Sequence, residues 1–439
     1  MFEGISGILW AVVTVLILLS SCYFTVKLKF VQFDFKEMMS NLFKKNKTYK
    51  GITPFQSLMM TLGARIGVGS IAGVAIAIYL GGPGSLFWMW ITAILAATNS
   101  FAETVLGIRY QCTDENGMNV GGPSYYIRDG LKKKKLGSLY AVLVILSYVG
   151  GYVSIQASTI THSLRTFTNI PSFLIGILIC FVTVFVIYGG LKNIASFIEK
   201  MVPATALIYL FIGGVAFVKN FSLIPDIFYN ILYDAFTFKS CTSGIIGGIV
   251  IGIQRAIFSN EAGLGTCSIS SSASSNTNAA SHGYLQMIGI YITTFLICTA
   301  TAVIILTSNY QSINFFNING IEIAQYAFTY HFGYIGGIIL FVSIVLFSLS
   351  SILTGYYDGE SSLRYFFSKM RPIYIVLLKT CTLFVLFLGS IISPSAIWIF
   401  VDIFTAIFAI INIYAIIKLR NVVNEEYRIN KRKKCDKIK

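Results

Sequence analysis

Long apolar runs that recur along the whole chain are the feature that most limits what this sequence can fold into. Eleven such runs occupy residues 4–26, 54–79, 85–108, 137–163, 172–190, 201–218, 243–272, 283–306, 333–357, 373–391 and 394–417. A stretch of roughly 20 apolar residues spans the hydrocarbon core of a bilayer as an α-helix. Unpaired backbone groups are costly in lipid, so such spans fold as helices. The sequence therefore predicts an all-α integral membrane protein with about 11 transmembrane helices.

Composition and charge support this class. Of the 439 residues, 55% are hydrophobic and 12% are charged, which excludes a soluble globule, a disordered chain and a secreted disulfide scaffold. Of the 33 Lys and Arg residues, 27 lie in alternate loops and in the C-terminal tail. By the positive-inside rule these segments are cytoplasmic, with the N-terminus outside and the C-terminus inside. We therefore expect a multi-pass plasma-membrane protein that meets membrane lipid and no nucleic acid; the oligomeric state stays open.

Two of the predicted spans are interrupted by glycines. The second span contains Gly67-Val68-Gly69-Ser70, and the seventh contains Gly263-Leu264-Gly265-Thr266, which lies 196 residues later. Glycine relaxes the backbone and lets a helix unwind. Unwound carbonyls can bind a cation, and N–H groups at the start of a half-helix can hold a carboxylate. The alternative reading is that each Gly-x-Gly only permits close helix packing.

The interrupted spans also reveal an internal repeat. Without the first span, the remaining ten divide five and five, and each five opens with a glycine-broken helix of opposite direction. Paired broken helices in inverted halves indicate the binding site of a secondary transporter. The predicted organisation is an extra N-terminal helix with a basic loop, two five-helix repeats and a basic cytoplasmic tail, at 1–53, 54–220, 221–418 and 419–439.

Several segments resemble a known family. Residues 61–90 (TLGARIGVGSIAGVAIAIYLGGPGSLFWMW) and 255–266 (RAIFSNEAGLGT), supported by 101–110, 121–131 and 298–306, are similar to the alanine or glycine:cation symporters, the sodium:alanine symporters. The resemblance implies a leucine-transporter-like fold of 5+5 inverted repeats with one extra N-terminal helix. It also implies sodium-driven uptake of small neutral amino acids, with sodium as a co-transported ligand, no cofactor and no enzymatic activity.

The resemblance assigns residues to sodium and to substrate. Sodium is expected at the carbonyls of Gly63 and Ile66 and the hydroxyls of Ser350 and Ser351, although a serine pair in a helix can simply bond to its own backbone. The expected substrate-binding residues are Gly67, Gly69, Ser70, Gln156, Ser259, Asn260, Gly263, Gly265, Thr266 and Gly355. Gln156 can equally have a structural role, in which its side chain forms hydrogen bonds between neighbouring helices. Gly355 and Asp358 stand where the family has large rings, so we expect a pocket that accepts side chains bulkier than alanine's.

Charges within the spans complete the candidate residues. They are Arg65, Glu103, Arg255, Glu261 and Asp402. Charges are costly in a bilayer, so each is expected to face protein or water and to be paired, as a gate, a coupling group or a structural ion pair. Proton coupling through one of the carboxylates is the alternative transport mechanism, and a channel is another. An integral-membrane enzyme is disfavoured because no nucleophile and base cluster at a span end.

Overall fold

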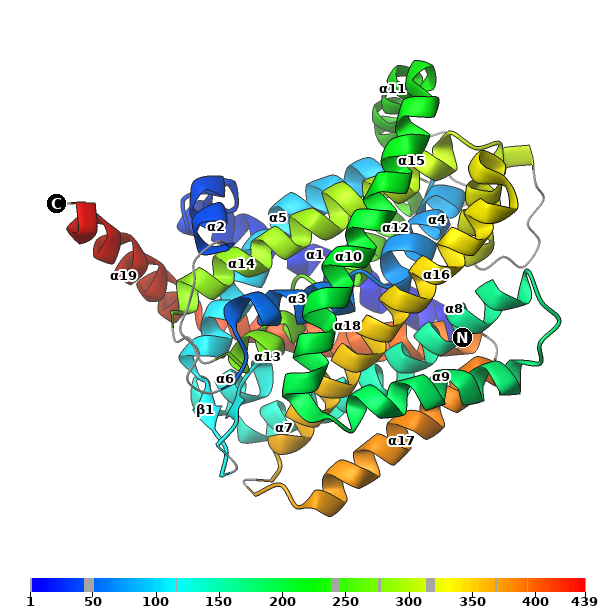
Figure 1. Ribbon diagram of the computed structural model, residues 1–439. Coiled ribbons are helices and arrows are strands. Elements are labelled where there is room, and N and C mark those ends of the chain that lie inside the picture. The colour runs from blue at the N-terminus through cyan, green and yellow to red at the C-terminus, as the bar shows by residue number, and fades with distance from the viewer. Residues whose placement is uncertain are drawn as a thin grey trace.

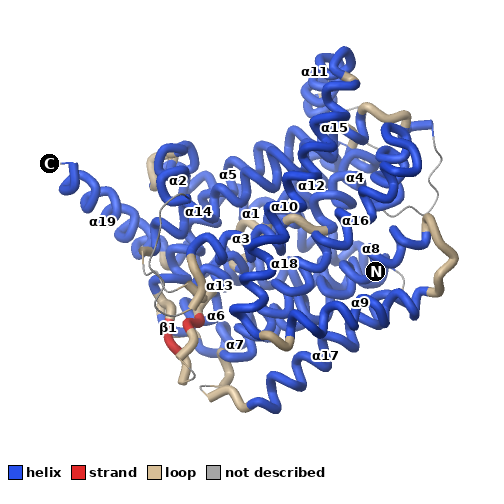
Figure 2. Tube along the Cα trace, viewed as in Figure 1, coloured by secondary structure: helices blue, strands red, loops and turns tan. Residues whose placement is uncertain are grey.

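The computed structural model describes residues 2–42, 51–115, 117–237, 245–274, 278–312, 320–367, 369–392 and 394–438. Helices make up almost all of this part, and a short antiparallel pair, β1 (Cys112–Thr113) and β2 (Asn119–Val120), lies at one end of the molecule (Figures 1 and 2).

The helices of the first part of the chain are α1 (Phe2–Lys27), α2 (Phe35–Leu42), α3 (Pro54–Arg65), α4 (Val68–Gly81), α5 (Gly84–Arg109), α6 (Pro123–Asp129), α7 (Lys134–Val144), α8 (Val153–Arg165), α9 (Ser172–Ile187), α10 (Gly190–Lys219) and α11 (Ile224–Phe236). Those of the second part are α12 (Ile245–Asn260), α13 (Thr266–Ser272), α14 (Ala279–Tyr291), α15 (Thr299–Leu306), α16 (Gly320–Arg364), α17 (Pro372–Ile391), α18 (Pro394–Lys418) and α19 (Arg420–Ile438). The π-helical segments η2 (Ile145–Tyr152) and η4 (Ile292–Cys298) join α7 to α8 and α14 to α15. Single 3-10 turns are η1 (Val31–Phe33), η3 (Phe221–Leu223) and η5 (Tyr310–Ser312).

The membrane spans agree with the sequence prediction. Within the described residues, nine helical segments are long and apolar enough to cross a membrane. The other two predicted spans are α9, a shorter apolar helix of 16 residues, and the pair α12–α13, which is broken. The pair α3–α4, broken in the same way, lies in the middle of the bundle (Figure 1).

Some predicted boundaries were wrong. Helix α10 begins at Gly190 rather than at residue 201, because its first turns carry charges that end an apolar window without ending a helix. The start predicted at 333 is confirmed as a boundary inside α16: this element runs from Gly320 to Arg364, but the backbone leaves helical geometry at Gly333, whose φ is 63°, so one helix ends and another begins there. Helices α2, α11 and α19 lie in segments predicted as loops or tail, since short or highly charged helices leave no long apolar run.

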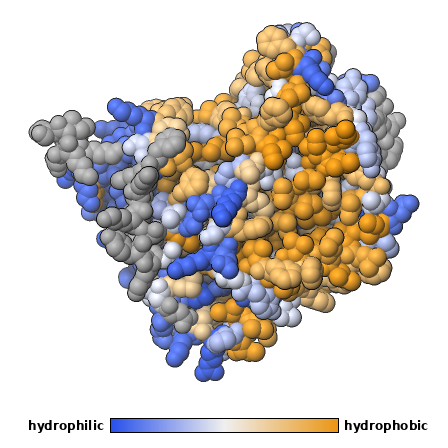
Figure 3. Space-filling view, viewed as in Figure 1, coloured by the Kyte–Doolittle hydropathy of each residue, from blue (hydrophilic) through white to orange (hydrophobic). Residues whose placement is uncertain are grey.

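Burial separates an inner from an outer set of helices. In the most apolar 18-residue stretch of each span, 94% of the residues are buried in α3 and α4, against 39% in α10 and 33% in α17. Figure 3 shows hydrophobic residues spread over the face formed by α9, α10, α16 and α17, with hydrophilic residues gathered toward the end that holds β1 and α19. The two broken helices are therefore shielded from lipid by continuous ones, as irregular backbone in a membrane requires.

Candidate functional site

The first break separates α3 from α4 at two residues. Helix α3 ends at Arg65, Ile66 leaves helical geometry at φ −87° and ψ 74°, and Gly67 at φ −131° and ψ −146° precedes the first turn of α4. The Ser70 hydroxyl donates to the Gly67 carbonyl at 3.1 Å, and its amide does so at 3.2 Å. The predicted interruption is confirmed at these positions.

The second break separates α12 from α13 and is longer, at residues 261–265. Three residues in it adopt positive φ: Glu261 at 53°, Gly263 at 87° and Gly265 at 93°. Glycine enters this left-handed region at little cost, whereas Glu261 does so against a steric penalty. The predicted second interruption is thus confirmed, and its glycines are required by the backbone conformation.

Oxygen atoms gather beside the first break. The Ser351 hydroxyl lies 2.8 Å from the Gly63 carbonyl oxygen and 3.4 Å from that of Ala64, and the Ser350 hydroxyl lies 3.2 Å from Gly63. One turn along α16, Thr354 donates to the Met60 carbonyl at 3.1 Å. The structure thus brings together three of the four residues predicted for sodium. The fourth, Ile66, is fully buried at the end of the same helix.

The same break touches α8 and α12. A Cβ added at Gly67 would overlap the Ser351 hydroxyl and lie 3.2 Å from Gln156 Nε2. One added at Gly69 would lie 3.3 Å from the Cα of Ser259. Gln156 is 3% exposed, and within the described residues its Oε1 has no hydrogen-bond partner. The predicted substrate residues of the first half therefore converge beside the oxygen cluster.

Side chains from other helices hold the second break in place. Tyr148 donates to Glu261 at 2.8 Å, and Thr266 donates to the other oxygen of that carboxylate at 3.1 Å. Tyr140 donates to the Leu264 carbonyl at 2.6 Å. The amide of Asn412, on α18, donates to the Gly263 carbonyl at 2.9 Å. Unwound backbone at this depth is thus satisfied by hydrogen bonds within the protein.

Asn412 connects the second break to a buried carboxylate. Its Nδ2 lies 2.8 Å from Glu103 Oε2, while the Cys267 thiol lies 3.0 Å from Glu103 Oε1. Tyr126 donates to the Asn412 carbonyl oxygen. Asn412 is not among the residues predicted from the sequence, although a lone amide inside an apolar run is a recognisable sign of a buried polar contact.

The remaining predicted substrate residues bond mostly to their surroundings. The Ser259 hydroxyl lies 3.2 Å from the Cys298 thiol. Asn260 accepts a hydrogen bond from the Ala262 amide at 3.1 Å, which helps the chain to leave α12. A Cβ added at Gly355 would make ordinary contacts of 3.6 Å with Tyr148 and 3.7 Å with Val153. Gly355 therefore faces the tyrosine that holds the second break.

None of the ion pairs within the described residues joins two of the intramembrane charges, and the hydrogen bonds that these charges make go to neutral groups. Arg65 donates to the Gln286 carbonyl at 3.0 Å and to Ser100 at 3.2 Å, and Glu103 and Glu261 accept from neutral donors. Arg255 stacks on Trp398 at 5.2 Å, and Asp402 is 8% exposed. Neutral partners satisfy a buried charge without the cost of desolvating a second one.

A stack of aromatic rings runs along one side of the two breaks. The rings of Tyr148 and Tyr152 lie parallel at 4.5 Å, Tyr152 stacks on Phe258 at 5.1 Å, and Phe258 contacts Trp398 at 4.8 Å. The stack therefore links the Glu261 hydrogen bond at one end to the Arg255 side chain at the other.

Comparison with known proteins identifies the family. The model of the sodium:alanine symporter family matches residues 1–438. The chain belongs to that family. Membership identifies a multi-pass membrane transporter that couples the movement of small neutral amino acids to sodium.

Three relatives come from Bacillus subtilis (strain 168). The amino-acid carrier protein AlsT is 32% identical, over 96% of this symporter and 90% of AlsT. The probable sodium/glutamine symporter GlnT is 32% identical, over 95% and 87%. The putative sodium/proton-dependent alanine carrier protein YrbD is 30% identical, over 99% and 93%.

Solved structures show that the symporter has the leucine-transporter fold. MhsT in complex with L-phenylalanine aligns with a TM-score of 0.58 and 14% identity, over 84% of this chain and 89% of MhsT. A Na⁺-coupled sialic acid symporter aligns with a TM-score of 0.53 and 14% identity, over 93% and 82%. The expected inverted-repeat fold with an extra N-terminal helix, α1, is thereby confirmed.

Proposed function

We propose that this symporter imports a small neutral amino acid with sodium, and that both bind at the break between α3 and α4. The observation that carries the proposal is the oxygen cluster of Gly63, Ala64, Ser350 and Ser351. Sodium is a hard cation that prefers oxygen ligands, as calcium and magnesium do. We assign sodium to these oxygens together with the carbonyl of Ile66, which ends the same helix.

The amino acid is assigned to the other side of the same break. The amides of Gly67, Val68 and Gly69 lie at the N-terminus of α4, which favours a carboxylate. Gln156 carries a buried amide oxygen free to accept from an ammonium group. Gly69 leaves room for α12 to approach, so Ser259 and Asn260 complete the site from the second half.

Coupling follows from the shared break. Sodium binds the Gly63 carbonyl, and the amino acid binds the amides that begin at Gly67. Both ligands stabilise one arrangement of the short segment between these residues, so each raises the affinity for the other. Sodium entry then drives import, aided by about 2.3 kcal/mol per charge per 100 mV of membrane potential.

The positive-inside bias supports an outside N-terminus and a cytoplasmic C-terminus. We assign the inverted repeats to residues 54–220 and 221–418.

Uptake by proteoliposomes tests the proposal. Radiolabelled alanine should accumulate when sodium is high outside, and imposing an inside-negative potential should increase the initial rate. Replacing outside sodium with choline at the same ionic strength is the control. Equal accumulation with and without sodium would contradict the proposal.

A second coupling ion, the proton, is favoured by one observation. Asp358 is 1% exposed, and within the described residues its Oδ1 has no hydrogen-bond partner. It lies one turn along α16 from Gly355, which faces Tyr148. A buried carboxylate oxygen without a hydrogen-bond partner is one to which a transported proton can bind. Alanine uptake driven by a pH gradient in sodium-free medium, and lost in Asp358→Asn, would support proton coupling; no such uptake would exclude it.

A further inference from the structure

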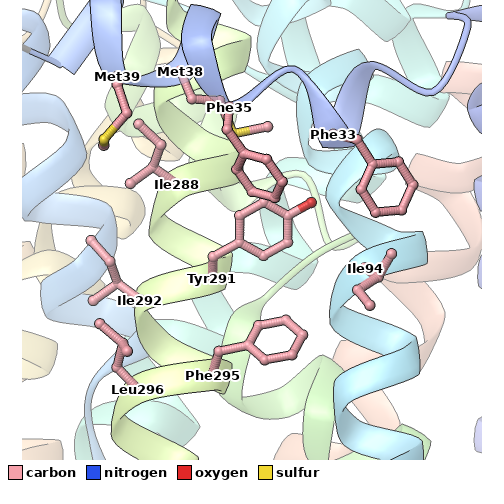
Figure 4. Close-up of a pocket in the computed structure, with 10 residues that line it drawn as sticks. All are labelled: Phe33, Phe35, Met38, Met39, Ile94, Ile288, Tyr291, Ile292, Phe295 and Leu296. Carbon is pink, nitrogen blue, oxygen red and sulfur yellow. The ribbon is translucent and has the colours of Figure 1, made fainter.

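An apolar cavity of about 480 Å³ lies outside the transport site, on the surface of the bundle. Its roof is η1 and α2, and its walls are α14, η4 and one residue of α5, Ile94 (Figure 4). In Figure 4 the side chains of α14 and η4 descend from the roof in the order Ile288, Tyr291, Ile292, Phe295 and Leu296. The cavity is thus an elongated groove along a membrane-spanning helix.

The groove opens toward lipid rather than toward the protein core. Four of its lining residues are large hydrophobic side chains with high exposure: Phe33 at 51%, Phe35 at 55%, Met39 at 43% and Leu296 at 47%. The roof is nevertheless fixed, because Tyr291 donates to the Gln32 carbonyl at 2.6 Å and its ring contacts that of Phe35 at 5.8 Å. A built apolar groove that faces a bilayer suits an acyl chain.

Basic residues occur in the chain segment that forms the roof of the groove. Lys27, Lys29 and Lys36 are exposed in and beside the segment that carries Phe33 and Phe35. The nearby carboxylates are already engaged: Asp34 binds Lys431 at 2.6 Å, and Glu37 accepts from Asn41 at 2.8 Å. The charge left in this segment is positive, and basic residues beside a membrane surface attract anionic headgroups.

We propose that this groove binds one phospholipid, with an acyl chain along η4 and an anionic headgroup on Lys29 and Lys36. The lipid belongs to the leaflet that the proposed orientation makes cytoplasmic. Its chain contacts one side of the π-helical segment η4, while Thr294 on η4 accepts at 3.5 Å from Asn260, the last residue of α12 before the second break. π-Helical segments are frequent at functional sites, and η4 lies between the lipid groove and the second break.

Photolabelling in vesicles tests the site without depending on transport. The probe is phosphatidylglycerol with a diazirine near the end of one acyl chain, and a phosphatidylcholine analogue is the zwitterionic comparison. We expect the labelled peptide to contain residues 288–296, with less label on residues 33–39, which lie at the headgroup end of the groove. Leu296→Trp fills the groove and should lower this labelling about tenfold. The matched control is Leu174→Trp on α9, because Leu174 and Leu296 have the same exposure of 47%.

A second pair of variants tests the headgroup. Lys29→Gln with Lys36→Gln should abolish the preference for phosphatidylglycerol over phosphatidylcholine, whereas Lys192→Gln with Lys200→Gln, exposed elsewhere on the chain, should keep it. Equal labelling in Leu296→Trp and Leu174→Trp would overturn the proposal. So would labelling spread evenly over the lipid-facing helices, or a crosslink from α2 to a second copy of the chain.

Discussion

The two broken helices both leave unwound backbone inside the bundle, but they differ in what surrounds that backbone. The break between α3 and α4 is two residues long, and around it lie main-chain carbonyls, serine hydroxyls and one glutamine amide. The break between α12 and α13 is five residues long, and tyrosine, asparagine and threonine side chains from three other elements and from α13 itself hold it. At the first break, oxygen atoms are placed where they can bind a ligand. At the second break, the backbone oxygens already accept hydrogen bonds from side chains of the protein.

This difference indicates a division of labour. The Ser350 and Ser351 hydroxyls also lie 2.7 Å and 3.1 Å from the Phe347 carbonyl of their own helix, so they can donate there and leave the Gly63 carbonyl and their own oxygens to a cation. At the second break the carbonyls of Gly263 and Leu264 each accept from a side chain of another helix, so movement there must break several bonds together. We therefore expect the first break to determine ion affinity and the second to determine the rate of conformational change. The four predictions below test this division, from the largest effect to the smallest.

Gly67→Ala should abolish transport. An added methyl would overlap the Ser351 hydroxyl and press on Gln156, so the oxygen cluster and the substrate amide are displaced together. The measurement is sodium-driven alanine uptake at equal amounts of reconstituted protein. Gly73→Ala in α4 is the control, since its Cβ meets nothing closer than 3.9 Å and should leave uptake near the wild-type rate. Normal uptake by Gly67→Ala would exclude this break as the binding site.

Ser351→Ala should raise the sodium concentration for half-maximal uptake by about thirtyfold, or ~2 kcal/mol, because a hydrogen-bonding group to a charge is lost. The maximal rate at saturating sodium should change much less. Ser343→Ala provides the matched comparison on α16, since among the described residues that hydroxyl bonds to its own helix alone, 2.9 Å from the Ile339 carbonyl. If the two variants need the same sodium concentration, the oxygen cluster does not bind sodium.

Asn412→Leu should lower the maximal uptake rate about tenfold and change the sodium dependence by less than about twofold. The substitution leaves the Gly263 carbonyl and one Glu103 oxygen without their donor, which costs roughly 1–3 kcal/mol for each group. Asn230→Leu, on the exposed part of α11, controls for the substitution itself. A changed sodium affinity with an unchanged rate would reverse the division between the two breaks.

Gly355→Ala should have the smallest effect and should act on selectivity. Its methyl makes ordinary contacts with Tyr148 and Val153, so folding is preserved while the pocket narrows. Competition of labelled alanine uptake by glutamine should weaken about fivefold, and competition by glycine should not change. Gly214→Ala, with no neighbour within 4 Å, is the control. Equal competition by glutamine in both variants would show that Gly355 does not line the pocket.

The sequence predicted the site's main-chain part better than its side-chain part. The breaks at Gly67 and Gly263 were predictable because a Gly-x-Gly motif occurs at the matching place in each of the two inverted halves. Serines 350 and 351 followed from the family resemblance, and the structure places them on the Gly63 carbonyl. The pairing of the charges was not predictable, because spacing along a helix does not indicate which neutral donor from another helix lies opposite Glu103 or Glu261.

The sequence by itself determined the class of protein, the number of spans, the two interruptions and the charge bias along the loops. These properties depend on local hydrophobicity and on backbone freedom, which each segment carries alone. The tertiary structure decided that Asn412 joins Glu103 to Gly263, that Gln156 reaches Gly67, and that α2 roofs a groove on η4. Such contacts join residues more than eighty positions apart, and only the packing of helices against one another brings them together.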